Sequence, residues 1–250
     1  MEVDDVADDQ RVGVVLFCVH RLTRRAGSTD RMVEIPSKDL RRKDGYWAMG
    51  KLANGTAWAV TAFSTTSFML GLYNAGLVDP RGLAVVLPVA FFFGGMMQIL
   101  VAILEIFAGN PFGATVFGSY GPFWVILGAI NVWFARSIPS TAMGSAMAVF
   151  LAMWAVISFY FFVASLPLNR VLSAILALIT IALVLLSLGA GLPSVFLTRI
   201  GGWVTLIFAT LGWYYAFAHL LQFTFERDVL PLGVVLRKPD QPAHGARSAR

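Results

Sequence analysis

Six apolar runs, each about 20 residues long, limit the fold more than any other feature of the sequence. They are Ala57–Leu77, Leu83–Ala108, Gly118–Ala135, Met143–Leu166, Val171–Ala190 and Gly202–Phe223. A helix of about 20 residues crosses the hydrocarbon core of a bilayer. The runs are too long and too continuous for the strands of a membrane barrel. The sequence therefore predicts an all-α integral membrane protein with six transmembrane helices.

The placement of charge supports this prediction. Only 13% of the residues are charged and 58% are hydrophobic, whereas a soluble domain carries about a quarter charged residues. Between Pro80 and Phe225 the sequence has one acidic residue, Glu105. The basic residues of that region fall near the ends of the predicted spans; they are Arg81, Arg136, Arg170 and Arg199. We expect the remaining charge to lie in water at the two ends of the chain.

Three regions are predicted from this pattern. Residues 1–45 form a disordered basic cytoplasmic tail, residues 46–232 form a six-helix transmembrane domain, and residues 233–250 form a C-terminal cytoplasmic tail. Ten Lys and Arg residues precede the first run and five follow the last. An even number of spans places both tails on one side, and the excess of basic residues marks that side as cytoplasmic. We expect a multi-pass protein of the plasma membrane, or cell inner membrane, in contact with membrane lipid.

Catalytic and metal-binding chemistry finds little support in the sequence. Cys18 is the single cysteine, so an internal disulfide and a thiolate metal cluster are both excluded. The spans hold too few His and acidic residues for a metal site, or for a nucleophile with its base. The basic pI of 9.7 arises from the tails and indicates membrane topology rather than nucleic-acid binding. We therefore predict no cofactor, no nucleic-acid partner and no enzymatic activity, which leaves transport, conduction or sensing.

Polar side chains inside the spans are costly and tend to face the interior of a helix bundle. Gln98 and Glu105 are seven residues apart, so they share one helix face, and Thr66 belongs to a run of hydroxyl residues in the first span. Each has a structural alternative: Glu105 can extend to the headgroups, and Gln98 can make an interhelix hydrogen bond. The tryptophans, Trp124 among them, are expected to include several anchors at the membrane interface.

The substrate class follows from the absence of Lys and Arg within the spans. A bulky polyanion would need fixed positive charge along its path. A small monocarboxylate can be held by amide, hydroxyl and backbone donors and by helix N-termini. It can also cross together with its proton, which removes most of the desolvation cost.

Several motifs resemble the acetate uptake transporter family, also called the succinate–acetate permease or GPR/FUN/YaaH-type family. The resemblance runs from about Leu52 to Leu232. Its motifs are "LYNAGL" (Leu72–Leu77), "GGMMQILVAILEIFAGNPFGATVFGSYGPFW" (Gly94–Trp124), "GGW" (Gly201–Trp203) and "VLPLG" (Val229–Gly233). It implies a six-helix protomer, assembled as a hexamer with a narrow pore in each protomer. It also implies transport of acetate and related short carboxylates, succinate in some members, by proton-coupled uptake or by anion conduction.

The resemblance also implies a set of pore residues. Apolar and aromatic side chains narrow the family's pore, and the matching positions are Phe63, Tyr120 and Ile179, with Gly212 at a small-residue position beside the pore. We expect Gln98 and hydroxyls such as that of Thr66 to donate or accept hydrogen bonds to the substrate. Glu105, Asn54 and Asn110 are expected to shape the cytoplasmic entrance. The turn Gly109–Pro111 would end the second span, and the glycines after it would bring Tyr120 against the pore.

One segment departs from the family pattern. The family signature before the first span reads Asn-Pro-Ala-Pro-Leu-Gly-Leu, and this chain has "NGTAWAV", Asn54–Val60. Two prolines are replaced by Gly55 and Ala57, and an indole is added at Trp58, so we expect an altered cytoplasmic mouth. The alternative function is a transport-inactive membrane sensor or scaffold on the same fold, with the path closed and the basic tail binding a partner or anionic lipid.

Overall fold

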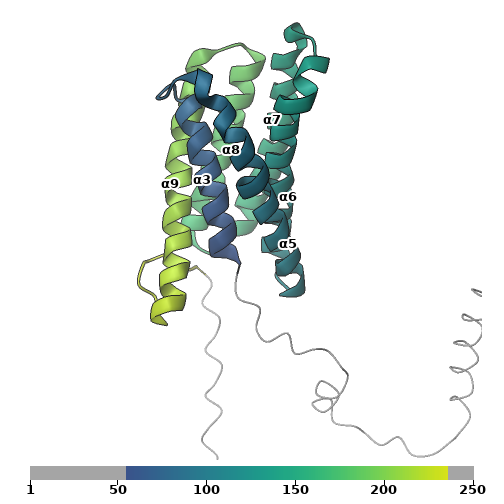
Figure 1. The fold of residues 1–250 in the computed structure, drawn as a ribbon. Coiled ribbons are helices and arrows are strands. Elements are labelled where there is room, and N and C mark those ends of the chain that lie inside the picture. Colours follow the sequence, from purple (N-terminus) through teal and green to yellow (C-terminus); the bar gives the residue numbers. More distant parts are fainter. Residues whose placement is uncertain (1–54, 236–250) are drawn as a thin grey trace, which may run out of the picture. The chain divides into compact units, whose positions relative to one another are not determined.

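The computed structural model describes residues 55–235. The predicted tail of residues 1–45, Asn54 and residues 236–250 lie outside the described residues. Six membrane-length segments, all helical, run up and down in one bundle (Figure 1), as the apolar runs predicted. The segments are α3 (Thr56–Asn74); η1, α4, η2 and α5 (Pro80–Val85, Val86–Pro88, Val89–Met96, Met97–Phe107); α6, η3 and η4 (Pro111–Ala129, Ile130–Phe134, Ala135–Ser137); α7 (Ser140–Ser165); α8 (Arg170–Gly191); and α9 (Val195–Phe225).

The helices form a closed ring. Helix α3 packs against α9, α9 against α8, and α8 against α7, while α6 packs against α5 and η2, which in turn pack against α3. Two hydrogen bonds join α6 to α7: the Tyr120 hydroxyl pairs with the Ser158 hydroxyl at 2.8 Å, and Trp154 Nε1 donates to the Ser119 carbonyl at 3.4 Å. The ring therefore encloses an interior that side chains from all six segments can reach.

Five of the six segments, α3 excepted, are long and apolar enough to cross a membrane by length and composition. Helix α3 has 19 residues, which is about 28 Å, so it has the length of a span but carries more hydroxyl groups. Its threonines bond to carbonyls one turn earlier: Thr61 to Ala57 at 2.7 Å and Thr66 to Ala62 at 2.8 Å. These bonds satisfy the hydroxyl groups within the helix itself, so a helix rich in hydroxyl residues can stand in the membrane-spanning ring.

Two predicted boundaries were wrong by about two turns. The third span begins at Pro111 rather than Gly118, and the sixth begins at Val195 rather than Gly202. In each case a capping side chain sets the start: Asn110 Oδ1 accepts from the Gly113 N–H, and Ser194 Oγ accepts from the Leu197 N–H. Caps satisfy the free N–H groups of the first turn, so a helix can begin before its apolar run does.

The break at Gly109–Pro111 lies where the sequence predicted it. Gly109 has a φ of +72°, a left-handed conformation that glycine adopts without strain and that ends α5. Asn110 then caps α6, and Pro111 occupies its first turn. The mixed stretch between the two apolar runs is thus a helix end, a cap and the first two turns of the next helix.

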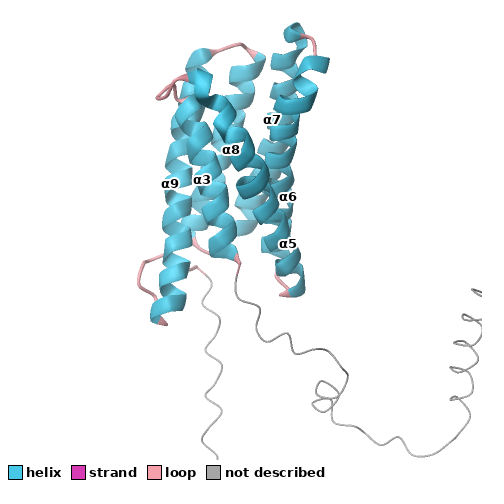
Figure 2. Cartoon of the chain, in the orientation of Figure 1, coloured by secondary structure: helices cyan, strands magenta, loops and turns pink. Residues whose placement is uncertain are grey.

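Both ends of the described chain lie at one end of the bundle (Figure 2). We call it the tail-side end and define it by Thr56, Asn110 and Asn169, which line one cavity there. The residues after α9 return to the start of α8, where the Arg170 N–H donates to the Gly233 carbonyl at 3.0 Å. The opposite, far end carries Asp79. Its carboxylate accepts hydrogen bonds from the Arg81 side chain, which lowers the pKa of Asp79 below its ordinary value. The shared end agrees with an even number of spans.

Close contact between α3 and α9 depends on Gly202. A Cβ at this position would collide with the backbone nitrogen of Ala75 and lie 2.6 Å from the carbonyl carbon of Asn74. Backbone atoms cannot move aside as a flexible side chain can, and small residues are what allow membrane helices to approach this closely.

We predict that Gly202→Ala destabilises the protein by about 1–3 kcal/mol, because the added methyl group forces α3 and α9 apart. Thermal unfolding of the detergent-purified protein, followed by circular dichroism, measures the effect. Gly118→Ala is the matched control, since a Cβ there would lie 3.6 Å from the nearest side-chain atom, on Ala102. Equal midpoints for the two variants would contradict the packing argument.

Candidate transport path

Three cavities follow one another through the bundle. A tail-side cavity of about 400 Å³ opens between α3, α6, α8 and α9, and a far-side cavity of about 290 Å³ lies between α3, η2, α6 and α8. A central cavity of about 40 Å³ lies between them and shares residues with both. It shares Leu70, Asn74, Phe123, Leu183 and Leu186 with the far-side cavity. The three spaces together mark a path along the axis of the bundle.

Phe63, Tyr120 and Ile179 separate the central cavity from the tail-side cavity, because each of the three lines both. The rings of Phe63 and Tyr120 have centroids 5.2 Å apart, and Phe63 also stacks on Phe208 at 5.8 Å. All three side chains are at least nine-tenths buried. The Tyr120 hydroxyl is held by Ser158 on α7, so Tyr120 presents its ring to the constriction.

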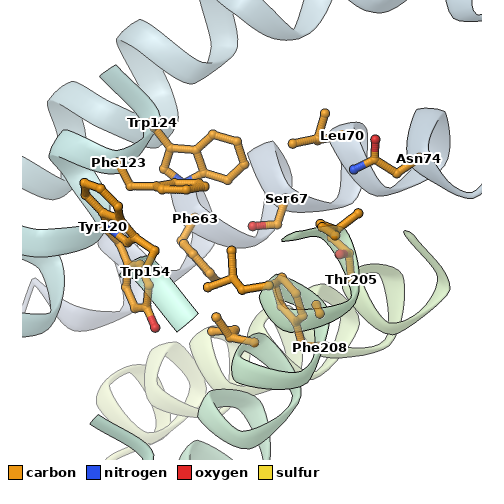
Figure 3. A pocket seen from close by; sticks show the side chains of 14 residues that line it. Phe63, Ser67, Leu70, Asn74, Tyr120, Phe123, Trp124, Trp154, Thr205 and Phe208 are labelled. Carbon is orange, nitrogen blue, oxygen red and sulfur yellow. The ribbon is translucent and has the colours of Figure 1, made fainter. Parts of the chain in front are cut away.

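Figure 3 shows the central cavity and the side chains around it. Its wall is almost wholly apolar and aromatic; Phe63, Phe123, Trp124, Trp154 and Phe208 contribute rings. Two polar atoms among the described residues of this wall are buried without a hydrogen-bond partner: the Ser67 hydroxyl and the Trp124 indole nitrogen. In the figure the Ser67 hydroxyl points into the space beside Phe63.

Gln98 lines the tail-side cavity with no exposed surface of its own. Its Nε2 donates to the Gly94 carbonyl at 2.6 Å, and this bond fixes the amide orientation because a carbonyl only accepts. The Oε1 atom has no partner within the described part of the chain. An unpaired acceptor therefore remains at Gln98.

Glu105 on α5 is buried at the tail-side end and connects α5 to α3 and α6. Its Oε2 accepts from Asn110 Nδ2 at 2.7 Å, and its Oε1 accepts from the Thr56 hydroxyl at 3.3 Å. Asn110 also caps α6, so a single side chain joins the start of that helix to the carboxylate. Asn110 and Thr56 line the tail-side cavity, and Glu105 lies behind them.

Two of the predicted positions, Thr66 and Gly212, line none of the three cavities. Thr66 is fully buried and bonds to its own helix, and Gly212 faces α3, where a Cβ would collide with the Ser64 hydroxyl. Asn54 lies outside the described residues. Trp58, expected to alter the entrance, is 43% exposed and is absent from the lining of the three cavities. Its indole therefore lies on the outer surface of α3.

Sequence reasoning missed several residues of the cavity walls. Trp124, one of the tryptophans among which interface anchors were expected, is 2% exposed and lies inside the bundle. Ser67 and Trp124 each follow a constriction residue by four positions, Phe63 and Tyr120, so each shares its helix face. This one-turn spacing was the signal that could have identified them.

We predict that Asn110→Asp destabilises the protein by about 1–3 kcal/mol, although Asp is as good a helix cap as Asn. The new carboxylate cannot donate to Glu105 and repels it. Adding Glu105→Gln should restore stability, because the Gln amide can donate to the introduced carboxylate in the double variant. Chemical unfolding of the single and double variants measures this, and no recovery in the double variant would argue against the pair. Asn131→Ala is the control, since among the described residues the Asn131 side chain bonds to the Leu127 carbonyl, one turn earlier in the same segment, and not to another helix.

Comparison with known proteins identifies the family of this chain. Residues 44–232 match the family model described as the GPR1/FUN34/yaaH family. The chain is 32% identical over 183 residues to the succinate-acetate/proton symporter SatP of Escherichia coli K12. This match covers 73% of this chain and 96% of the relative. It is 30% identical over 214 residues to ammonia transport outward protein 2 of Saccharomyces cerevisiae, covering 77% of this chain and 75% of the relative. The solved structure of the bacterial acetate channel SatP has a TM-score of 0.69 and 32% identity, covering 73% of this chain and 100% of that one. This chain is a multi-pass membrane protein that belongs to the GPR1/FUN34/yaaH family.

Proposed function

We propose that this protein transports acetate and related short monocarboxylic acids across the plasma membrane, through the three cavities and the constriction of Phe63, Tyr120 and Ile179. One observation carries the proposal: a nearly uncharged path, narrowed by apolar side chains, runs along the axis of the bundle. The names of the bacterial relatives, a succinate-acetate/proton symporter and an acetate channel, support the same substrate class. The role is transport rather than catalysis, and the described residues contain no metal-ligand cluster.

The two relatives' names leave the transported form open, and the lining of the path favours the undissociated acid. Among the described residues, no Lys or Arg lines any of the three cavities, and Gln98 offers an unpaired acceptor. That acceptor can receive the proton of a carboxylic acid but repels a carboxylate. Protonating a carboxyl group at pH 7 costs about 4 kcal/mol, and burying a carboxylate costs several kcal/mol even after relaxation. The two costs are of the same order, so the acceptor and the missing cations decide between the forms.

The first test is uptake of labelled acetate into liposomes that hold the purified protein. We expect uptake well above that of empty vesicles, which corrects for the acid that crosses lipid unaided. Ile179→Trp, which fills the constriction, should reduce uptake to the level of empty vesicles while the protein elutes as the folded species. Wild-type uptake equal to that of empty vesicles would overturn the proposal and favour the sensor or scaffold alternative.

The transported form is tested by pH and voltage. At a fixed total acetate concentration, the initial protein-dependent rate should rise about tenfold when the pH falls by one unit near neutrality, because the undissociated fraction rises by that factor. No steady acetate current should accompany it under voltage clamp. A current that reverses at the acetate equilibrium potential would instead establish conduction of the anion.

We further propose that the protein assembles as a hexamer, as the family resemblance implies. Helix α7 offers a surface for such an assembly: Val149, Met153, Val156, Tyr160 and Val163 are all about half exposed and follow one helix face. Such a face must be covered by lipid or by another protomer. The mass of the detergent complex by native mass spectrometry distinguishes the two.

A further inference from the structure

We propose that Ser67 and Trp124 form a binding site for one carboxyl group inside the central cavity. The proposal rests on the transport function argued above and names the point on the path where the acid is held. Ser67 lies on α3, one turn after Phe63, and Trp124 lies on α6, one turn after Tyr120. Both therefore lie just beyond the constriction, seen from the tail-side end, and both line the cavity (Figure 3).

The two polar atoms are suited to a carboxyl oxygen. The indole N–H only donates, and the Ser67 hydroxyl can donate. Ser67 is 1% exposed and Trp124 is 2% exposed, and neither polar atom has a partner within residues 55–235. A buried donor without a partner is costly, so two that line one cavity indicate a missing acceptor. Acetate or acetic acid supplies such an acceptor and also a methyl group for the apolar wall.

Two other polar side chains of the same wall, those of Thr205 and Trp154, are already bonded to the backbone. The Thr205 hydroxyl donates to the Gly201 carbonyl at 2.8 Å, and Trp154 Nε1 donates to the Ser119 carbonyl. Of the two tryptophans in this wall, Trp154 is bonded to the backbone, and of its Ser and Thr residues, Thr205 is; the Tyr120 hydroxyl is bonded to Ser158. Ser67, Trp124, Thr205 and Trp154 all line the cavity. Ser67 and Trp124 differ from the other two in having no hydrogen-bond partner for their polar atoms among the described residues.

The size of the cavity sets the class of ligand. A volume of about 40 Å³ accommodates about three water molecules. This space suits a carboxyl group with one or two further carbons, acetate or propionate. A four-carbon dicarboxylate exceeds this volume and would have to extend into the far-side cavity. The site therefore selects short monocarboxylic acids.

The test compares four variants in labelled-acetate uptake. Trp124→Phe and Ser67→Ala each remove one unpaired donor, and we expect KM for acetate to rise about tenfold in each. Trp154→Phe and Thr205→Val make the same chemical changes in the same wall but remove donors already bonded to the backbone, so their KM should shift much less. Size-exclusion profiles and thermal midpoints establish that each variant is folded. If Trp124→Phe fails to fold, Ser67→Ala is compared with Thr205→Val. If Ser67→Ala fails to fold, Trp124→Phe is compared with Trp154→Phe.

The outcomes separate this proposal from the transport function. Wild-type protein without acetate uptake would refute the function itself. If wild-type protein takes up acetate and all four variants shift KM by the same amount, the transport function stands but the proposed site is wrong. Ser67 and Trp124 would then contribute no more to acetate binding than the control residues do. Competition provides a second readout. Unlabelled propionate should inhibit acetate uptake with a constant close to its own KM, and succinate at least tenfold more weakly; equal inhibition by both would overturn the size limit.

Discussion

The structure depends on one constraint: a polar group inside the hydrocarbon region must find a partner or face a cavity. The helices supply hydrogen-bond partners for the backbone N–H and C=O groups. Three threonine hydroxyls of α3 donate to carbonyls of their own helix. Five buried side-chain atoms of the described residues have no such partner. Four of these belong to residues that line the path: Ser67, Gln98, Trp124 and His219. The fifth, Ser64 Oγ, instead lies against Gly212.

This distribution connects packing with transport. Close contacts at Gly95, Gly121 and Gly202 bring helices together where no substrate passes. The space left over is concentrated along the axis, and there the wall is aromatic and aliphatic rather than charged. Such a wall admits a small acid with little affinity for its charge, while a few unpaired donors and acceptors orient the carboxyl group. Weak binding at several points is also what allows a transported molecule to leave.

The Glu105–Asn110–Thr56 group shows how a costly charge can be structural. Its carboxylate is buried, but two side-chain donors compensate it at the tail-side end of the bundle. From the sequence we expected Glu105 and Asn110 to shape the entrance. In the structure only Asn110 of the two lines the cavity, and Glu105 fixes the position of Asn110 from behind. Whether this arrangement affects flux is separate from its role in joining α3, α5 and α6.

The sequence by itself determined the number of spans, the shared end of the two termini and the family, because apolar length and ordered motifs are properties of the chain. It also brought Phe63, Tyr120 and Ile179 together as a group through the family resemblance. Only the tertiary structure decided where helices begin, since the caps Asn110 and Ser194 act before hydrophobicity does. It also decided which polar atoms remain unpaired. A residue's hydrogen-bond partner is set by neighbouring helices and turns, so Trp124 and Trp154 cannot be distinguished until the bundle has closed.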